Sequence, residues 1–344
     1  MKKKILIVGA GITANEICKR LKKKYHISTC GINKFDKAVG NSDKHYFFNY
    51  KNHNKLLKFC KKGKFNFIIP DGNDISYLSS SYVAEKLDYD GFENYKFSKN
   101  ILNKISFNTI CKKNNISVPK FSLKKNFYSD KIKMPVIFRP NFTYSGKNVF
   151  KIENKKDFLK LKKNKTKKFI VSQFINGTLH SCSMIINQKG NRFFFVDEFC
   201  NENPFRVDFS SCPSIIQKKT RRIVIKNLLK LTKIFKLTSG ILHIQFIKKN
   251  NKIYIIEATR RCPGDFYGIL IQKSYNFDYY SNYSLNFTSP QSKLNYIEKR
   301  NLFFRKTLKN IKDYNSFGSS KEKKLFLSYN KIQKNKYGVI IFKK

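Results

Sequence analysis

The chain has 344 residues and a mass of 40.6 kDa, which suits two or three packed units rather than one small domain. Its hydrophobic content of 41%, with 33 Phe and 19 Tyr, can form a large core and excludes a disordered chain. The 71 Lys and Arg residues outnumber the 22 Asp and Glu residues, and the net charge is +49. Ten of the 71 are arginine, and the lysines are spread along the chain. A dedicated nucleic-acid surface would gather arginine and aromatic residues on one face. We therefore expect nonspecific polyanion binding, with a nucleic-acid-binding protein as an alternative.

Nothing in the sequence predicts a membrane or secreted protein. No apolar run approaches the roughly 20 residues of a membrane-spanning helix. The apolar run at 5–8 ends at Gly9, too early for a signal peptide. The eight cysteines contain no CxxC pair and are too dilute for a disulfide scaffold. We expect reduced thiols, no membrane contact and a cytoplasmic location.

The first 95 residues alternate short apolar runs with helical patterns, as a parallel α/β sheet requires. We expect strands at 4–8, 27–32 and 65–69, with one helix after the first strand and another at 53–60. The segment from Pro70 to Asp74 then indicates a loop and a helix cap. The pattern predicts a Rossmann-like domain over residues 1–95.

Strand-rich sequence begins after a helix expected at 98–113. Further strands are expected at 136–139, 169–174, 181–186 and 193–198, followed by a long helix at 214–235 and two strands at 242–247 and 253–258. Asn250 and Asn251 join the last two strands, and asparagine tolerates the left-handed angles of a hairpin turn. These elements predict a second domain over 96–290, with a smaller lid at about 119–175, and a capping segment over 291–344.

A glycine-rich turn follows the first strand. Gly9-Ala10-Gly11 opens a helix, so its backbone amides could bind a phosphate, and Ala14 replaces the third glycine of a dinucleotide-binding motif. That motif needs an acid at the end of the second strand, where Asp36 is the nearest carboxylate. A structural strand-to-helix turn is favoured, and an NAD-dependent oxidoreductase is the alternative.

The strands on either side of Asn251 carry the strongest set of polar residues. A turn centred on Asn251 places Gln245 opposite Glu257, because their residue numbers sum to twice 251. The returning strand ends in Thr259, Arg260 and Arg261. A carboxylate beside an amide, a hydroxyl and guanidinium groups suits Mg²⁺ and phosphate oxygens. The alternative is an ion pair between Glu257 and an arginine at the sheet edge.

Two other strand ends carry polar residues. Arg139 precedes a loop over 141–147 that could cover phosphates, although a Walker A motif is absent. That loop contains Ser145, Gly146 and Lys147. Gln173, Phe174 and Ile175 end another strand, where backbone groups could contact an adenine edge. An ordinary hairpin connection and a strand-to-turn boundary are the alternatives.

Taken in order, these segments resemble the ATP-grasp superfamily, specifically its carboxylate-amine ligase or carbamoyl-phosphate-synthase-like branch. The resemblance covers about residues 4–290 and includes Val8 to Gly11, Ile69 to Asp74, Ser98 to Pro119, Pro135 to Pro140, Ser145 to Val149, Gln173 to Gly177, Gly240 to Phe246 and Ile255 to Arg261. Each motif is short, and their order supplies the specificity. The resemblance implies an α/β and α+β fold, with a Rossmann-like domain before a two-part ATP-grasp domain.

The resemblance also implies an activity and a site. In such ligases ATP phosphorylates a substrate carboxylate, and an amine then attacks the acyl phosphate. ATP would contact Lys104, Arg139, Ser145, Gly146, Lys147, Gln173, Phe174 and Ile175, and Mg²⁺ would be held by Gln245, Glu257 and Thr259. Arg261 would stabilise developing charge, and Arg260 would face the acceptor. We expect small-molecule carboxylate and amine substrates, with a homodimer as a possible assembly.

The sequence departs from the family pattern at four positions. Arg139 stands in place of a lysine, Gln245 in place of the first metal-binding acid, and Thr259 in place of an asparagine. The hinge acid that holds the ribose falls near Leu179, which cannot accept a hydrogen bond. These departures leave open a catalytically reduced ATP-grasp protein that binds nucleotide without ligation.

Overall fold

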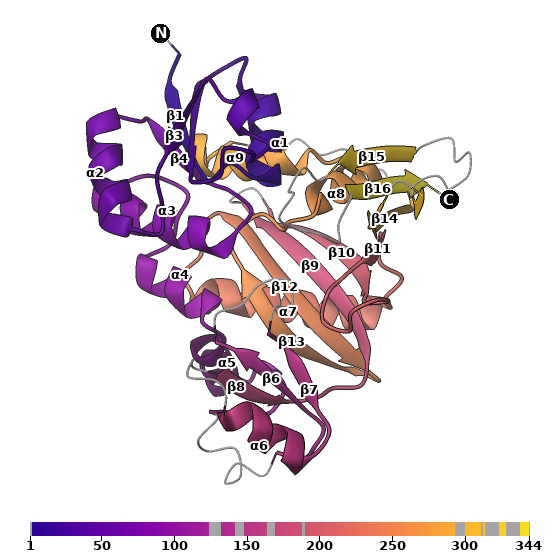
Figure 1. The fold of residues 1–344 in the computed structure, drawn as a ribbon. Coiled ribbons are helices and arrows are strands. Elements are labelled where there is room, and N and C mark those ends of the chain that lie inside the picture. The colour runs from indigo at the N-terminus through magenta and orange to yellow at the C-terminus, as the bar shows by residue number, and fades with distance from the viewer. Residues whose placement is uncertain are drawn as a thin grey trace.

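The structure is a computed structural model of the chain. It describes residues 2–123, 132–141, 148–163, 169–187, 190–292, 300–310, 312–313, 323–327 and 338–343. Within these residues three β-sheets follow one another from the N-terminal part to the smaller lid, with the largest sheet between them (Figure 1). The expected mixture of a parallel N-terminal sheet and antiparallel sheets is confirmed.

The N-terminal sheet is parallel, in the order β3-β2-β1-β4. Its strands are β1 (Lys4–Val8), β2 (His26–Gly31), β3 (Lys44–Phe47) and β4 (Phe67–Pro70). Helices α1 (Ile12–Leu21), α2 (His53–Gly63) and α3 (Asp74–Leu87) alternate with them. Strand β1 is an apolar run because it lies in the middle of the sheet, with Ile5 to Val8 fully buried.

Two short helices connect this sheet to the rest of the chain. They are α4 (Tyr95–Leu102) and α5 (Lys104–Lys113), so the expected single helix over 98–113 is wrong. The break falls at Asn103, whose backbone is extended and whose side chain accepts a hydrogen bond from the Ser106 amide. Asparagine therefore ends one helix and caps the next. This break places Lys104 at the first turn of α5.

The lid is a small antiparallel sheet in the order β5-β8-β6-β7. Its elements are β5 (Phe121–Leu123), β6 (Val136–Pro140), β7 (Phe150–Ile152), α6 (Lys155–Lys163) and β8 (Phe169–Gln173). Phe138 and Phe169 stack in its core with ring centroids 4.3 Å apart. The lid thus has its own small core, and β6 and β8 match the predicted strands.

The central sheet is antiparallel and has the order β13-β12-β9-β10-β11-β14-β16-β15. Its strands are β9 (Thr178–Ile186), β10 (Arg192–Phe199), β11 (Phe209–Cys212), β12 (Gly240–Lys249), β13 (Lys252–Thr259), β14 (Phe303–Leu308), β15 (Lys323–Leu327) and β16 (Gly338–Lys343). The last three strands lie in the expected capping segment. Strand β14 pairs with β11, β16 with β14 and β15 with β16, so that segment extends the sheet.

Helices cover both faces of the central sheet (Figure 1). Helix α7 (Lys218–Ile234) packs Val224 and Leu228 against one face, with Met184 and Ile244 from the strands. Helices α8 (Tyr267–Tyr275) and α9 (Tyr279–Thr288) share the other core with α1 and β1. Because this second face also meets the N-terminal sheet, polar residues on it lie close to loops of that sheet.

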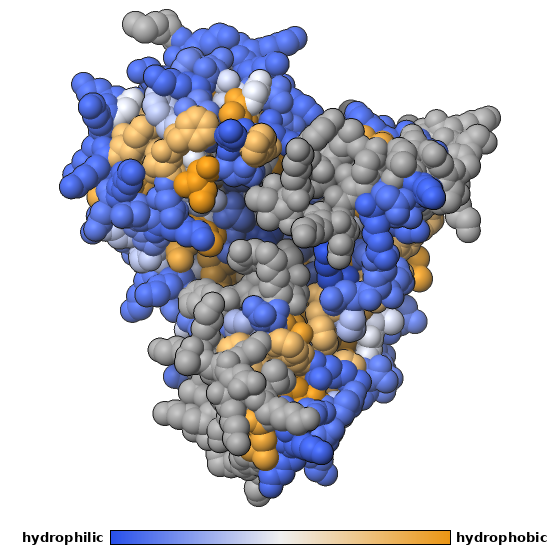
Figure 2. All heavy atoms as spheres, in the orientation of Figure 1, coloured by the Kyte–Doolittle hydropathy of each residue, from blue (hydrophilic) through white to orange (hydrophobic). Residues whose placement is uncertain are grey.

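Hydrophilic residues cover most of the coloured surface in the view of Figure 2, as the excess of lysine predicts, and hydrophobic patches lie over the N-terminal part and the lid. In the described part of the chain, no helix has the length and apolar character needed to cross a membrane. Every cysteine is a free thiol, and seven of the eight are buried.

Candidate functional site

The hairpin of β12 and β13 pairs Gln245 with Glu257, which confirms the predicted register. Lys249 pairs with Lys252, so the turn is centred between Asn250 and Asn251. A β-bulge between Gln245 and Phe246 shifts the register by one residue. The bulge thereby restores the predicted pairing, and the two polar side chains lie on the same face of the sheet.

A row of polar side chains crosses this face of the sheet. Glu257 on β13 is followed by Gln245 on β12 and Ser181 on β9. Glu198 on β10 shares their face, because it lies two residues from Val196, the partner of Ser181. The Gln245 Nε2 donates a hydrogen bond of 2.6 Å to the Glu198 Oε2. We call these four residues the polar row.

Positive side chains surround Glu257. The Lys104 Nζ lies 3.6 Å from the Glu257 Oε2, although Lys104 is buried. Arg139, at the end of β6, donates from Nη2 to the Ile256 carbonyl at 3.1 Å. Burial lowers the pKa of Arg139, and the Glu257 charge opposes that shift. The buried Arg139 Nε has no hydrogen-bond partner among the described residues, so it can donate to a bound anion.

The N-terminal domain contributes Asp74 to the same cluster. Its Oδ1 accepts a hydrogen bond of 2.7 Å from the Arg261 Nε and another of 3.2 Å from the Thr259 hydroxyl. Burial raises the pKa of Asp74, but the charges of Arg261 and Lys104 outweigh burial and hold it below its ordinary value. The same pairing, with the Glu257 charge, raises the pKa of Arg261 against its burial. Asp74 therefore fixes Arg261 beside Glu257.

Sequence reasoning missed Asp74 as a site residue. The loop from Pro70 to Asp74 indicated a helix cap, and Asn73 does cap α3. The neighbouring acid can contact Arg261 because the N-terminal sheet packs against the face that carries the polar row. A helix-cap pattern alone does not show that approach.

Arg260 points elsewhere. Its Nε lies 2.9 Å from the Glu93 Oε2, and its Nη1 and Nη2 donate to the carbonyls of Ile241 and Ser239 at 2.5 Å. Both side chains of this ion pair are almost completely buried, at 2% and 1% exposure. The structure thus places the guanidinium of Arg260 in a buried network that joins β12 to the segment before α4.

Two further charged residues were not predicted to belong to the site. Burial raises the pKa of Glu198 despite the hydrogen bonds from Ser181 and Gln245. Arg305 on β14 is buried, and its Nε and Nη2 donate to the Ser210 hydroxyl at 3.4 and 3.2 Å. The Arg305 charge also acts on Glu198. The sequence indicated the strand that contains Glu198, but gave no signal that this carboxylate reaches Gln245 across β9.

The strand end at 173–175 connects the lid to the central sheet. The backbone amides of Gln173 and Phe174 donate within the lid, to Lys120 at 2.8 Å and Pro135 at 3.2 Å. Ile175 is buried. A Cβ on Gly177 would lie 2.3 Å from the Lys248 carbonyl, so only glycine fits this crossing. Ser145, Gly146 and Lys147 lie outside the described residues.

The glycine-rich turn after β1 is occupied by an internal carboxylate. The Asp71 Oδ2 accepts from the Gly11 amide at 2.9 Å, and its Oδ1 accepts from Ala14 at 2.9 Å and Gly72 at 2.7 Å. The amides of Gly11 and Ala14 lie at the start of α1, where a dinucleotide would place its pyrophosphate. A Cβ on Gly11 would lie 2.8 Å from the Asp71 Oδ2. The arrangement favours the structural interpretation of this turn over an NAD site.

The polar row offers oxygen ligands that fit Mg²⁺. Glu257 has a carboxylate, and Gln245 has an amide oxygen that accepts no hydrogen bond among the described residues. One or two carboxylates, together with phosphates and water, commonly complete a protein magnesium site. The Thr259 hydroxyl instead donates to Asp74 and accepts from the Arg261 amide. No group of three or more His, Cys, Asp or Glu side chains in the described residues could hold a metal.

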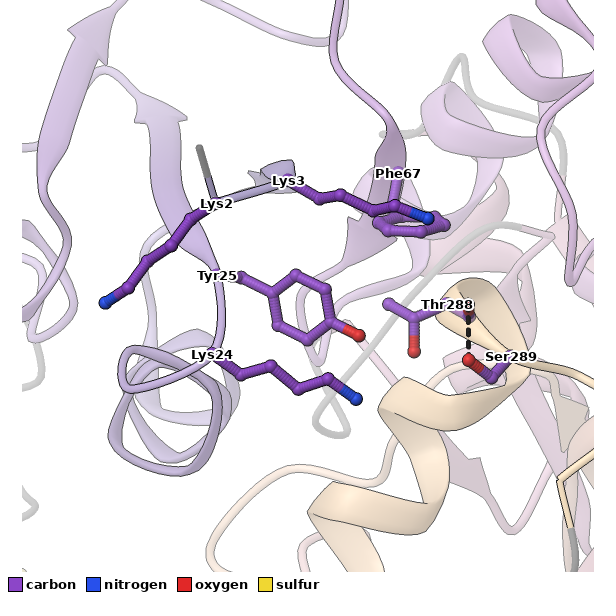
Figure 3. Close-up of a pocket in the computed structure, with 7 residues that line it drawn as sticks. All are labelled: Lys2, Lys3, Lys24, Tyr25, Phe67, Thr288 and Ser289. Carbon is purple, nitrogen blue, oxygen red and sulfur yellow. Dashed lines mark hydrogen bonds between the residues drawn. The ribbon is translucent and has the colours of Figure 1, made fainter.

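A separate hollow of about 710 Å³ lies at the end of the N-terminal sheet that is away from Asp74. It is lined by Lys2, Lys3, Lys24, Tyr25, Phe67, Thr288 and Ser289. In Figure 3 the Tyr25 hydroxyl points toward Thr288, with Lys3 and Lys24 on either side. The hollow adjoins the amino ends of β1 and β4, whereas Asp74 follows the carboxyl end of β4. It is therefore not part of the cluster around Glu257.

The comparisons with known proteins agree with this geometry. Residues 101–264 match the ATP-grasp domain family. N5-carboxyaminoimidazole synthetase from Staphylococcus aureus, in a complex with ADP, has a TM-score of 0.85 and 18% identity, over 100% of this chain and 94% of that chain. L-amino acid ligase from Bacillus licheniformis has a TM-score of 0.81 and 14% identity, over 99% of this chain and 93% of that chain. A comparison with the curated proteins gives no match.

Proposed function

We propose that this chain, which belongs to the ATP-grasp superfamily through its domain at residues 101–264, is an ATP-dependent ligase that joins a carboxylate to an amine. The observation that carries the proposal is the cluster around Glu257. Lys104 from α5, Arg139 from the lid and Arg261 from the end of β13 place positive charge around one carboxylate. Cations from three elements, of which Lys104 and Arg139 are buried, suit a polyphosphate bound together with a divalent cation.

The roles of the residues follow from their positions. Glu257 and the Gln245 oxygen would hold Mg²⁺, which supplies neutralisation of phosphate charge when it is bound. Lys104 and the unpartnered Arg139 Nε would donate to phosphate oxygens. Arg261, held by Asp74, would stabilise charge that develops on the transferred phosphoryl group. The residues mainly align the phosphate and neutralise its charge.

The proposed reaction has two steps. A substrate carboxylate oxygen attacks the γ-phosphorus of ATP, the bond to the bridging oxygen breaks, and ADP leaves. The amine nitrogen then attacks the acyl carbon, inorganic phosphate leaves, and the nitrogen loses a proton. An acyl phosphate reacts readily with water, so burial of Lys104 and Arg139 supports a site that excludes solvent.

The test is a measurement of ADP release with a panel of carboxylates and amines. We expect ADP formation that requires both substrates, with a condensed product and free phosphate in equal amounts by mass spectrometry and phosphate assay. If ADP is released but no carboxylate–amine pair of the panel gives a condensed product, ligation is contradicted. The Glu257→Gln variant is the control for contaminating ATPases, because removal of the carboxylate ligand should abolish the signal.

A catalytically reduced nucleotide-binding protein is the second candidate. Two residues favour it. The Thr259 hydroxyl already donates a hydrogen bond to Asp74, and Leu179 occupies the place of the acid that is expected to hold the ribose. Mg²⁺-dependent ATP binding without ADP formation across the panel would support this candidate. ADP formation coupled to a condensed product would eliminate it.

A further inference from the structure

Gln245 lies between two carboxylates of the polar row. Glu257 is on the neighbouring strand β13, and Glu198 reaches Gln245 from the other side, across β9. A side-chain amide has a carbonyl oxygen at one end and an NH₂ group at the other, and only the oxygen can ligate a cation. The orientation of this amide therefore decides whether Gln245 can share a cation with Glu257.

The contact with Glu198 sets that orientation. The Gln245 Nε2 donates to the Glu198 Oε2 at 2.6 Å, so the NH₂ end points toward β10. The Oε1 end is then left on the side of β13, and in the described part of the chain it accepts no hydrogen bond. The reversed orientation would place two acceptor oxygens against each other at Glu198 and would turn NH₂ toward Glu257. In that orientation Gln245 could not ligate a cation that is bound to Glu257, because its NH₂ group would face the cation.

Glu198 is itself held firmly. It is 6% exposed, and the Ser181 side chain also hydrogen bonds to its carboxylate. The Ser181 Oγ lies 2.9 Å from the Tyr267 hydroxyl on α8. A chain of side chains from α8 through β9 thus fixes the acceptor that Gln245 meets. Surface carboxylates, by contrast, rotate freely and select no orientation.

We propose that Glu198 is a positioning residue, which orients the Gln245 amide so that Oε1 faces Glu257 and completes a magnesium site. The inference rests on the proposed Mg²⁺-ATP function. It gives a physical reason why an amide can serve at a position where the family has an acid. A carboxylate has two equivalent oxygens and needs no such partner, whereas an amide needs a fixed acceptor for its NH₂ group.

The experiment compares Mg²⁺-dependent ATP binding by calorimetry in three proteins. Glu198→Met has a similar length but no acceptor, and Glu198→Gln keeps an acceptor oxygen for the Gln245 NH₂. We expect Glu198→Met to raise the Mg²⁺ concentration needed for half-maximal ATP binding about tenfold or more. Glu198→Gln should stay within about threefold of the wild type. If Glu198→Met does not fold, Glu198→Ala, which leaves room for water beside Ser181, replaces it.

A second background separates orientation from packing. In Gln245→Glu the side chain presents oxygens on both sides, so Glu198→Met should no longer weaken Mg²⁺-dependent binding. The change should be neutral or favourable there, because it also removes one of two adjacent carboxylates. An equal loss in both backgrounds, or a loss in Glu198→Gln as large as in Glu198→Met, would overturn the proposal. Unfolding curves of all variants show which of them are folded.

The outcomes also separate this inference from the proposed function. If the wild type binds ATP with a clear Mg²⁺ dependence and the Glu198 variants do the same, the positioning role is wrong and the function stands. If the wild type binds no ATP at any Mg²⁺ concentration, both are wrong. The measurement reads binding and needs neither the carboxylate nor the amine substrate.

Discussion

Replacement of Arg260 by methionine should lower the free energy of unfolding of the protein. It should not disturb the nucleotide site directly. Arg260 forms its ion pair with Glu93 at 2.9 Å, and the two side chains are 2% and 1% exposed. Its other nitrogens donate to two backbone carbonyls, of Ser239 and Ile241. Methionine fills most of the space but leaves Glu93 charged, buried and without its cation.

The expected loss is about 3–5 kcal/mol, the usual result when one partner of a buried ion pair is removed. Glu93 keeps two hydroxyl donors, Tyr77 at 2.9 Å and Ser98 at 2.7 Å, and these partly stabilise its charge. The double variant Arg260→Met, Glu93→Gln should lose less than the two single variants together, because it removes both charges.

Urea unfolding measures the loss, and ATP binding under conditions where all variants are folded measures the effect on the site. Arg261→Met is the matched control, since its partner Asp74 is more exposed and the pair adjoins Glu257. We expect the control to weaken ATP binding more than Arg260→Met and to cost less stability. An Arg260→Met protein with wild-type stability and no ADP formation would refute this reasoning and restore Arg260 to the catalytic set.

Two further predictions concern the N-terminal turn and the pH dependence of stability. Asp71→Ala should cost about 1–2 kcal/mol of unfolding free energy, because amides at the start of α1 lose their acceptor. Urea unfolding checks it, and tight NADH binding by either protein would contradict the structural role of the turn. Burial lowers the pKa of His243 from 6.5 to about 3, so below pH 6.5 the unfolded chain binds a proton that the folded protein does not. The free energy of unfolding should fall by about 1.6 kcal/mol through this residue between pH 6.5 and 5. His243→Gln should show a correspondingly flatter pH profile of stability, and equal slopes in the two proteins would contradict this prediction.

The strands of the sheets were the most predictable part of the fold. Central strands such as β1 and β6 are short apolar runs, and their burial confirms that reading. Helices α8 and α9 escaped prediction because they are buried on nearly all sides. Tyr279, Tyr280 and Tyr283 are each fully buried, among serines and asparagines, so no amphipathic stripe distinguishes the helix from a loop.

The site was predictable from the residues alone where it depends on one hairpin, and the family resemblance added Lys104 and Arg139, which lie near Glu257. The predicted pairing of Gln245 with Glu257 is confirmed. The turn lies half a residue from its predicted centre, and the bulge after Gln245 cancels the resulting change in register. Arg260 and Arg261 are neighbours at a strand end, and the sequence cannot show which of them turns into the buried network. Asp74 and Glu198 join the cluster only through contacts between distant strands and domains. Such contacts leave no periodic signal in the sequence.

Calorimetric titration of ATP, with and without Mg²⁺, tests the central claim most directly. The salt concentration should be high enough to screen the diffuse charge of +49, and tripolyphosphate serves as the control for charge alone. We predict Mg²⁺-dependent ATP binding that tripolyphosphate does not reproduce and that Glu257→Gln weakens strongly. ATP binding that is the same with and without Mg²⁺, or that Glu257→Gln leaves unchanged in a folded protein, would contradict the assignment of Glu257 to a magnesium-nucleotide site.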